Sequence, residues 1–163
     1  MRNIVDRPAR DTAAQLLRNF VSGKVSNDAF EDAQPTTHDL AIDAIWDTAW
    51  VFYDDSKEHR LIGKYRLPPD QRRACVRWIL FLYSDHLYEW PTIYLPGIDP
   101  ASRTQRNFLK RLFSMHQHLN EDQVMNFMST GHYPVWPFLR VADYKKALAQ
   151  PRLLSASAKP NLS

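Results

Sequence analysis

The chain has 163 residues, of which 44% are hydrophobic, 12% aromatic and 24% charged, and its formal net charge is +3. This length fits one ordinary domain, and this composition is typical of a globular protein rather than a disordered or fibrous one. A charge excess this small does not indicate nucleic-acid binding, and no apolar run approaches the roughly twenty residues of a membrane span.

Two helices are predicted in the N-terminal part of the chain. Thr12 has the spacing of a capping box with Gln15, which predicts a first helix over residues 12–22. Ser26 has the side chain of an N-cap and predicts a short second helix over residues 27–33. Both segments carry apolar residues that we expect to face a common core.

The next predicted helix, over residues 38–54 behind Thr37, has two faces of opposite character. Apolar residues within about 120° of arc define a core-facing stripe, namely Ile42, Ile45, Trp46, Ala49, Phe52 and Tyr53. The opposite face collects acidic residues and one tryptophan, namely Asp39, Asp43, Asp47, Asp54 and Trp50.

A helix over residues 70–84 is predicted from the Pro68-Pro69 pair, because proline is favoured in the first helical turn. It carries three basic residues early, namely Arg72, Arg73 and Arg77, and then becomes apolar on every side. A helix without a polar face must be surrounded by other elements, so we expect this one to be central.

The remaining chain predicts helices over residues 99–116, 120–131 and 141–149, and a disordered tail over residues 151–163. The expected fold is all-α: a compact irregular bundle of about six helices around the central helix of residues 70–84, with ordered aromatic and proline-rich loops. We expect one domain over residues 1–150.

The sequence holds few signs of catalysis or cofactor binding. It lacks a glycine-rich phosphate loop, a nucleophile elbow and a zinc-protease motif, so we assign no catalytic residue and expect no cofactor. His116 and His118 would point in different directions on a helix, so no metal site is predicted. The lone Cys75 has no cysteine partner, which favours a reducing compartment and a cytoplasmic location.

Asp39, Asp43 and Asp47 are four residues apart and would align along one side of their helix. Like charges at this spacing destabilise a helix by a few tenths of a kcal/mol per pair, so a compensating partner is expected. The row could be solvated or paired inside the fold with the basic residues of the helix over 70–84. It could instead bind a basic partner protein or, as a weaker alternative, a divalent cation from outside.

Trp50 lies on the same side of the helix as this row. An exposed tryptophan beside carboxylates is typical of an interface anchor, unless a neighbouring loop, such as residues 84–99, covers it. The leading hypothesis is a small cytosolic protein-binding module, of which an immunity or antitoxin-like inhibitor is one form. Its expected contact residues are Asp39, Asp43, Asp47, Trp50 and Asp54.

Two alternatives stay open. The first is an enzyme with an unrecognised site in which loops bring Glu58, His59 and Asp85 together. The second is a nucleic-acid binder that uses a basic row, namely Arg103, Arg106 and Lys110.

Three strings carry a resemblance to known proteins: residues 20–32, residues 78–91 with Trp90-Pro91, and residues 135–140 with Trp136-Pro137. Together they resemble small, stand-alone bacterial helical proteins of uncharacterised function. The resemblance implies a bacterial, single-domain, cytosolic protein and carries no activity. Physically, we expect the Trp-Pro pairs to hold extended segments against helices through large buried rings.

Overall fold

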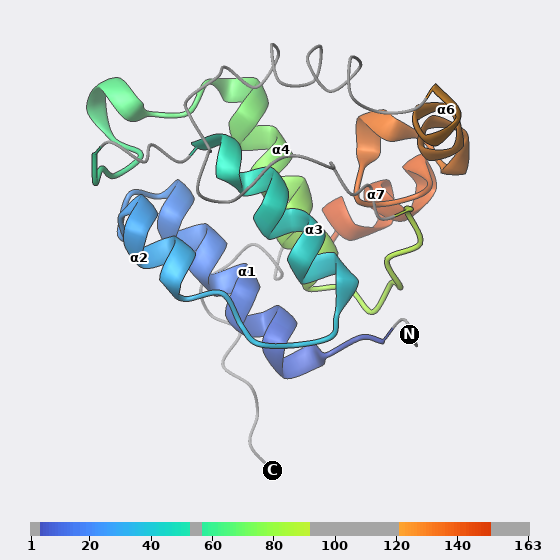
Figure 1. Ribbon diagram of the computed structural model, residues 1–163, viewed down its shortest axis with the longest axis horizontal. Coiled ribbons are helices and arrows are strands. Elements are labelled where there is room, and N and C mark those ends of the chain that lie inside the picture. Colours follow the sequence, from blue (N-terminus) through green and yellow to red (C-terminus); the bar gives the residue numbers. More distant parts are fainter. Residues whose placement is uncertain (1–3, 53–56, 92–120, 151–163) are drawn as a thin grey trace.

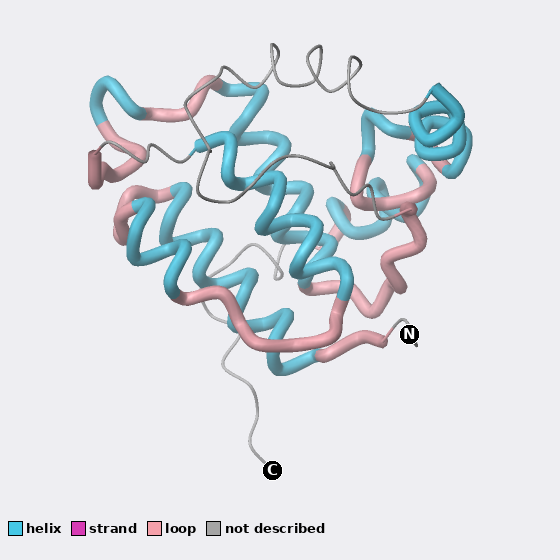
Figure 2. The backbone as a smooth tube through the Cα atoms, viewed as in Figure 1, coloured by secondary structure: helices cyan, strands magenta, loops and turns pink. Residues whose placement is uncertain are grey.

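The computed structural model describes residues 4–52, 57–91 and 121–150 (Figure 1). The regular structure in these ranges is entirely helical, which confirms the all-α prediction, and Figure 2 shows helices joined by loops without a strand among them. Six α-helices are present there: α1 (Arg7–Val21), α2 (Asn27–Asp32), α3 (Leu40–Ala49), α4 (Pro69–Leu82), α6 (Glu121–Thr130) and α7 (Val141–Leu148). Short 3₁₀ helices occupy Trp50–Phe52 (η1), Gly63–Tyr65 (η2) and Tyr133–Val135 (η4). None of these described helices combines the length and apolar character that crossing a bilayer requires.

Helix α1 begins five residues earlier than the capping-box pattern predicted. Asp6 is its N-cap, with a side-chain oxygen that accepts from the N–H of Ala9, and Pro8 lies in the first turn. Thr12, expected at the N-cap, instead donates its hydroxyl to the carbonyl of Pro8 inside the helix. The Asp-x-Pro sequence was therefore the true start signal.

Helix α2 begins at the predicted N-cap. The Ser26 hydroxyl accepts from the N–H of Ala29, and Phe30 turns into the core. The Phe30 ring stacks between Phe20 and Trp46, with centroid distances of 4.5 and 4.2 Å. These three rings join α1, α2 and α3.

Helix α3 is shorter than predicted at both ends. Asp39, rather than Thr37, is its N-cap, because Asp39 has extended backbone angles and a side chain that accepts from Ala41 N–H. The helix then tightens into η1 at Trp50. The predicted stripe is buried at Ile42, Ile45, Trp46, Ala49 and Phe52, whereas Tyr53 lies outside the described residues.

Helix α4 begins at Pro69, as the proline pair predicted, and packs against α1, α3 and α7. Its second half is buried from Trp78 to Leu82. Its place at the centre of the complete fold stays a prediction, because the predicted helix over 99–116 lies outside the described residues. The same holds for the tail over 151–163.

The two Trp-Pro segments are packed as expected. Trp90 is buried and donates its indole N–H to the carbonyl of Pro137 (3.0 Å), while the indole of Trp136 donates to the hydroxyl of Tyr88 (3.3 Å). The Trp136-Pro137 peptide bond is cis. The Trp90 ring also contacts Phe127 of α6, with centroids 4.8 Å apart. The Phe127 contact attaches α6 to the segment that carries Trp90.

Candidate functional site

Asp39, the first residue of the predicted acidic row, lies inside the protein. Its side chain has 0% exposure. It caps α3 and accepts from the backbone N–H of Ala41 at 3.0 Å. A carboxylate in this position points back at the helix end rather than outward from its side. Asp39 therefore does not share the exposed face on which we expected it.

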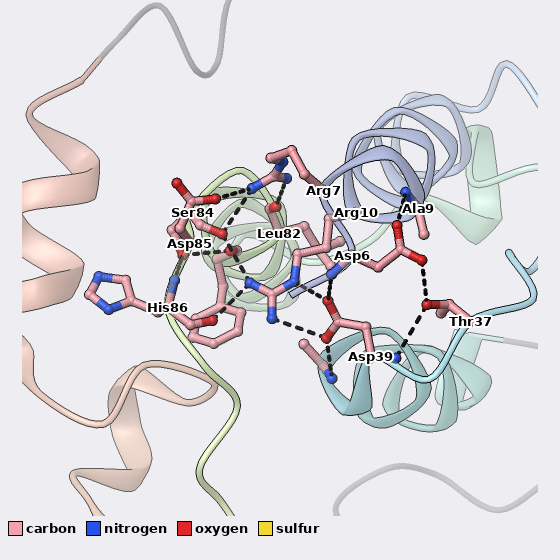
Figure 3. A network of polar contacts seen from close by, with 12 residues as sticks. Asp6, Arg7, Ala9, Arg10, Thr37, Asp39, Leu82, Ser84, Asp85 and His86 are labelled. Carbon is pink, nitrogen blue, oxygen red and sulfur yellow. Dashed lines mark hydrogen bonds and ion pairs between the residues drawn. The ribbon is translucent and has the colours of Figure 1, made fainter. Parts of the chain in front are cut away.

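Arg10 of α1 neutralises this buried carboxylate (Figure 3). Its Nε donates to Oδ2 of Asp39 at 2.6 Å and its Nη2 to Oδ1 at 3.0 Å. Arg10 is also fully buried, and paired hydrogen bonds of this kind are the strong geometry for guanidinium and carboxylate. Helix α1 thus supplies the internal partner that the sequence suggested would come from the start of α4.

The other end of the Arg10 guanidinium binds the chain that leaves α4. Its Nη1 donates to the carbonyls of Ser84 (2.9 Å) and His86 (2.8 Å). Arg7, one turn earlier, donates to the carbonyls of Leu82 and Ser84. Arg7 thereby satisfies a carbonyl in the last turn of α4, where a cation also interacts favourably with the helix dipole, and Arg10 holds the loop that follows.

Asp6 joins the start of α1 to the same cluster. Its N–H donates to Asp39 Oδ2 at 3.0 Å, and its carboxylate accepts from the Thr37 hydroxyl at 2.8 Å (Figure 3). Hydrogen bonds from Ala9 N–H and from Thr37 lower the pKa of Asp6. This network connects the starts of α1 and α3 to the end of α4, through Asp6, Arg7, Arg10, Thr37 and Asp39. Its geometry supports a structural role rather than a binding site.

Asp43 and Asp47 are exposed on α3, and Trp50 is half-buried just beyond them. Helix α2 contributes to the same surface: the Gln34 amide that follows it donates to Asp43 Oδ1 at 3.2 Å. Glu31 and Trp50 line one small cavity of about 10 Å³. We call Glu31, Asp43, Asp47 and Trp50 the acidic face.

Burial and neighbouring negative charge both affect the titration of Asp43. Partial burial raises the pKa of Asp43, the carboxylates of Asp47 and Asp39 raise it further, and the Gln34 hydrogen bond opposes them. Glu31 was absent from the sequence-based set, since the contacts that bring α2 beside α3, the Phe30–Trp46 packing and the Gln34–Asp43 hydrogen bond, do not follow from the spacing of residues.

The basic residues of α4 have other roles. Arg72 and Arg73 are exposed, while Arg77 donates its Nε to the carbonyl of Trp136 at 2.6 Å. Burial lowers the pKa of Arg77. Among the described residues, none of these arginines forms an ion pair with the aspartate row. Asp54, the last member of the predicted set, lies outside the described residues.

The three residues of the enzyme hypothesis are not brought together. Glu58 and His59 line a concave pocket of about 430 Å³ before the start of α4. Asp85 follows the other end of α4, where it pairs with Arg7 at 3.2 Å (Figure 3). The basic row of Arg103, Arg106 and Lys110 lies outside the described residues.

Further chemistry is limited in the described ranges. No three His, Cys, Asp or Glu side chains gather there closely enough to hold a metal ion. Cys75 is buried in α4, and burial raises its pKa to about 12, so its thiol stays protonated at neutral pH. No family model, curated protein or solved structure matches the chain. Within residues 4–52, 57–91 and 121–150, the acidic face and the pocket beside His59 are the two surfaces that we consider for a function.

Proposed function

We propose that this protein is a protein-binding module whose contact surface is the acidic face, and that its partner is a basic protein. An inhibitor that neutralises a basic toxin or effector, in the manner of immunity proteins and antitoxins, is the concrete form of this proposal. A reducing, cytoplasmic setting, suggested by the lone buried Cys75, belongs to the same proposal.

The distribution of charge along the chain carries the proposal. Residues 25–52 contain six acidic side chains and no lysine or arginine, although the whole chain has a net charge of +3. One of the six, Asp39, is used internally by Arg10. Asp43 and Asp47 stay exposed, and their mutual repulsion is a cost that a cationic partner would relieve.

Trp50 gives this surface an apolar element. It is half-buried and lies against the cavity lined by Phe30, Trp46 and Glu31. A tryptophan at the margin of a rigid helix presents a large ring whose remaining exposed area a partner can cover, and tryptophan is enriched among residues that dominate binding energy. Charge would then set the orientation of the partner, and the ring would add affinity.

The test is affinity capture from the native host with wild-type protein and with the Asp43→Lys/Asp47→Lys variant. The matched control is Asp70→Lys/Glu89→Lys, which makes the same change in charge at two exposed acids elsewhere. A partner captured by wild type is then purified, and its Kd is measured for all three proteins at several salt concentrations.

We expect the Asp43/Asp47 variant to bind its purified partner at least about tenfold more weakly and the control to bind as wild type does. Binding by wild type should weaken as salt rises. Equal affinity of the Asp43/Asp47 variant and wild type would remove the acidic face from the proposed function.

A further inference from the structure

Two segments of the chain carry a concentration of charge opposite in sign to that of the acidic face. Residues 22–26 and 57–66 together contain five basic side chains and one acidic one, Glu58. The basic residues are Lys24, Lys57, Arg60, Lys64 and Arg66. Their net charge of +4 exceeds the +3 of the whole chain, so the remaining residues have a net charge of −1.

Asn27 fixes these two segments to each other, although they are more than thirty residues apart in the sequence. Its side chain is fully buried, its N–H donates to the carbonyl of His59 (3.0 Å), and its Oδ1 accepts from the N–H of His59 (2.6 Å). Arg60 adds a second link by donating to the carbonyl of Lys24 at 2.8 Å. The two segments are therefore held together by a buried contact at Asn27 and an exposed one at Arg60.

Between these segments lies the pocket of about 430 Å³, lined by Ser26, Glu58, His59, Arg60, Ile62 and Tyr65. A volume of this size falls in the ordinary range of ligand sites. The half-buried Tyr65 ring packs on His59, with centroids 4.3 Å apart, and the exposed Lys64 places its Nζ 4.9 Å from the centroid of Tyr65. The pocket thus combines an aromatic platform with one cation in its wall, Arg60, and another beside the ring, Lys64.

We propose that this pocket binds single-stranded nucleic acid, with a base stacked in the pocket at Tyr65 and the flanking phosphates on the surrounding cations. The ammonium of Lys64 would move from the ring to a phosphate as the base enters, so that one attractive contact replaces another. Glu58 on the pocket wall can accept a hydrogen bond from an amino or imino group of the base.

A single strand fits these observations better than a duplex. In a duplex the base faces are stacked on their neighbours, so only the phosphates would reach this surface and the Tyr65 platform would go unused. An acidic protein would likewise use the cations alone. Both alternatives predict that removal of the Tyr65 ring has no effect on binding.

The experiment is fluorescence anisotropy of the full chain with labelled single-stranded DNA and RNA twelve-mers of mixed sequence, and with the matching DNA duplex, over a range of salt. The variants are Tyr65→Ala, Tyr65→Phe and Lys64→Glu/Arg66→Glu. Lys145→Glu/Lys146→Glu on α7 is the matched charge control, because both lysines are exposed and α7 lies well away from residues 57–66 (Figure 1). Circular dichroism of each variant checks that the helices remain.

We expect single strands to bind more tightly than the duplex and to dissociate as salt rises. Tyr65→Ala should weaken binding by about tenfold, whereas Tyr65→Phe should keep it, since stacking needs the ring and not the hydroxyl. Lys64→Glu/Arg66→Glu should weaken binding by at least about tenfold, and the α7 control should stay within about twofold of wild type.

Three results would overturn the proposal: no binding at low salt, equal affinity for duplex and single strand with no effect of Tyr65→Ala, or displacement of the strand by polyglutamate as readily as by unlabelled strand. The Asp43→Lys/Asp47→Lys variant separates this proposal from the proposed function. It removes negative charge elsewhere, so it should bind the strand at least as tightly as wild type even if it fails to bind a protein partner.

Discussion

Arg10 and Asp39 meet through two hydrogen bonds, of 2.6 and 3.0 Å, and neither side chain is exposed to solvent. Asp39 uses its remaining capacity on the N–H groups of Asp6 and Ala41, so every oxygen of the carboxylate has two donors. Loss of either charge in this pair should therefore lower the free energy of unfolding more than loss of a charge at the surface.

Asp39→Ala should destabilise the protein by about 3–5 kcal/mol, because it leaves the Arg10 charge buried without its partner and removes the N-cap of α3. Urea unfolding followed by circular dichroism measures the change in the free energy of unfolding. Asp85→Ala is the control: this acid also pairs with an arginine, Arg7, but is 84% exposed, so its loss should cost less than about 1 kcal/mol. Similar costs for both variants would contradict the importance assigned to the buried pair.

Asp43→Asn should stabilise the protein at pH 7 by a few tenths of a kcal/mol. The pKa of Asp43 is raised in the folded state, so the folded state binds a proton more readily than the unfolded chain, and the ionised form opposes folding at neutral pH. The gain should shrink as pH falls and vanish below the ordinary value of 3.8, where both states are protonated. Unfolding curves between pH 3 and pH 7 measure this trend.

Asp11→Asn is the control for Asp43→Asn. Asp11 pairs with Arg7 one turn away, so loss of its charge should leave stability unchanged or slightly lower at pH 7. A stability gain of the same size at both positions would mean that net charge, rather than crowding on the acidic face, explains the effect at Asp43.

Cys75 should not react with a thiol reagent such as DTNB in the native protein at pH 8. Its side chain is fully buried in α4, and burial raises its pKa to about 12, so both access and the thiolate form are missing. Reaction should become complete in denaturing urea, and its rate under native conditions should follow unfolding. Rapid labelling of the folded protein would show that α4 opens locally near this residue.

Gly131→Ala should destabilise the junction between α6 and η4 by about 1–3 kcal/mol. A Cβ at this position would lie 2.9 Å from the side chain and carbonyl oxygen of Leu139 and 3.0 Å from the Trp90 ring. Thermal unfolding measures the loss, and Gly131→Ala should cost less in a Leu139→Ala background, where one of the clashing groups is absent. A Gly131→Ala variant as stable as wild type would indicate that the α6 junction adjusts freely.

Sequence reasoning succeeded where the decisive contacts are local. Ser26 caps the helix directly behind it, the Pro68-Pro69 pair starts the next, and the apolar stripe of α3 follows from spacing alone. Each of these signals acts within a few residues of itself.

Asp39 was misplaced because its partner is 29 residues away in the sequence. A signal did exist: Arg10 lies on the same stripe of α1 as the buried residues Ala13, Ala14 and Leu17, and a cation on an apolar stripe requires a buried acid. The pocket at Tyr65 gave no comparable signal, because the Asn27–His59 contact that assembles it joins two segments with no shared pattern.

The cluster that Arg10 forms with Asp39, Ser84 and His86 also affects how the chain folds. It needs the start of α1, the start of α3 and the end of α4 at once, and these contacts span 29 to 76 residues of sequence. No fragment that ends before α4 can complete it, so we expect it to form late and to break only when the three helices separate together. The amide protons of Asp6 and Ala41, which bind Asp39, should then exchange with solvent at the rate of global unfolding, although both lie at helix ends that would ordinarily fray.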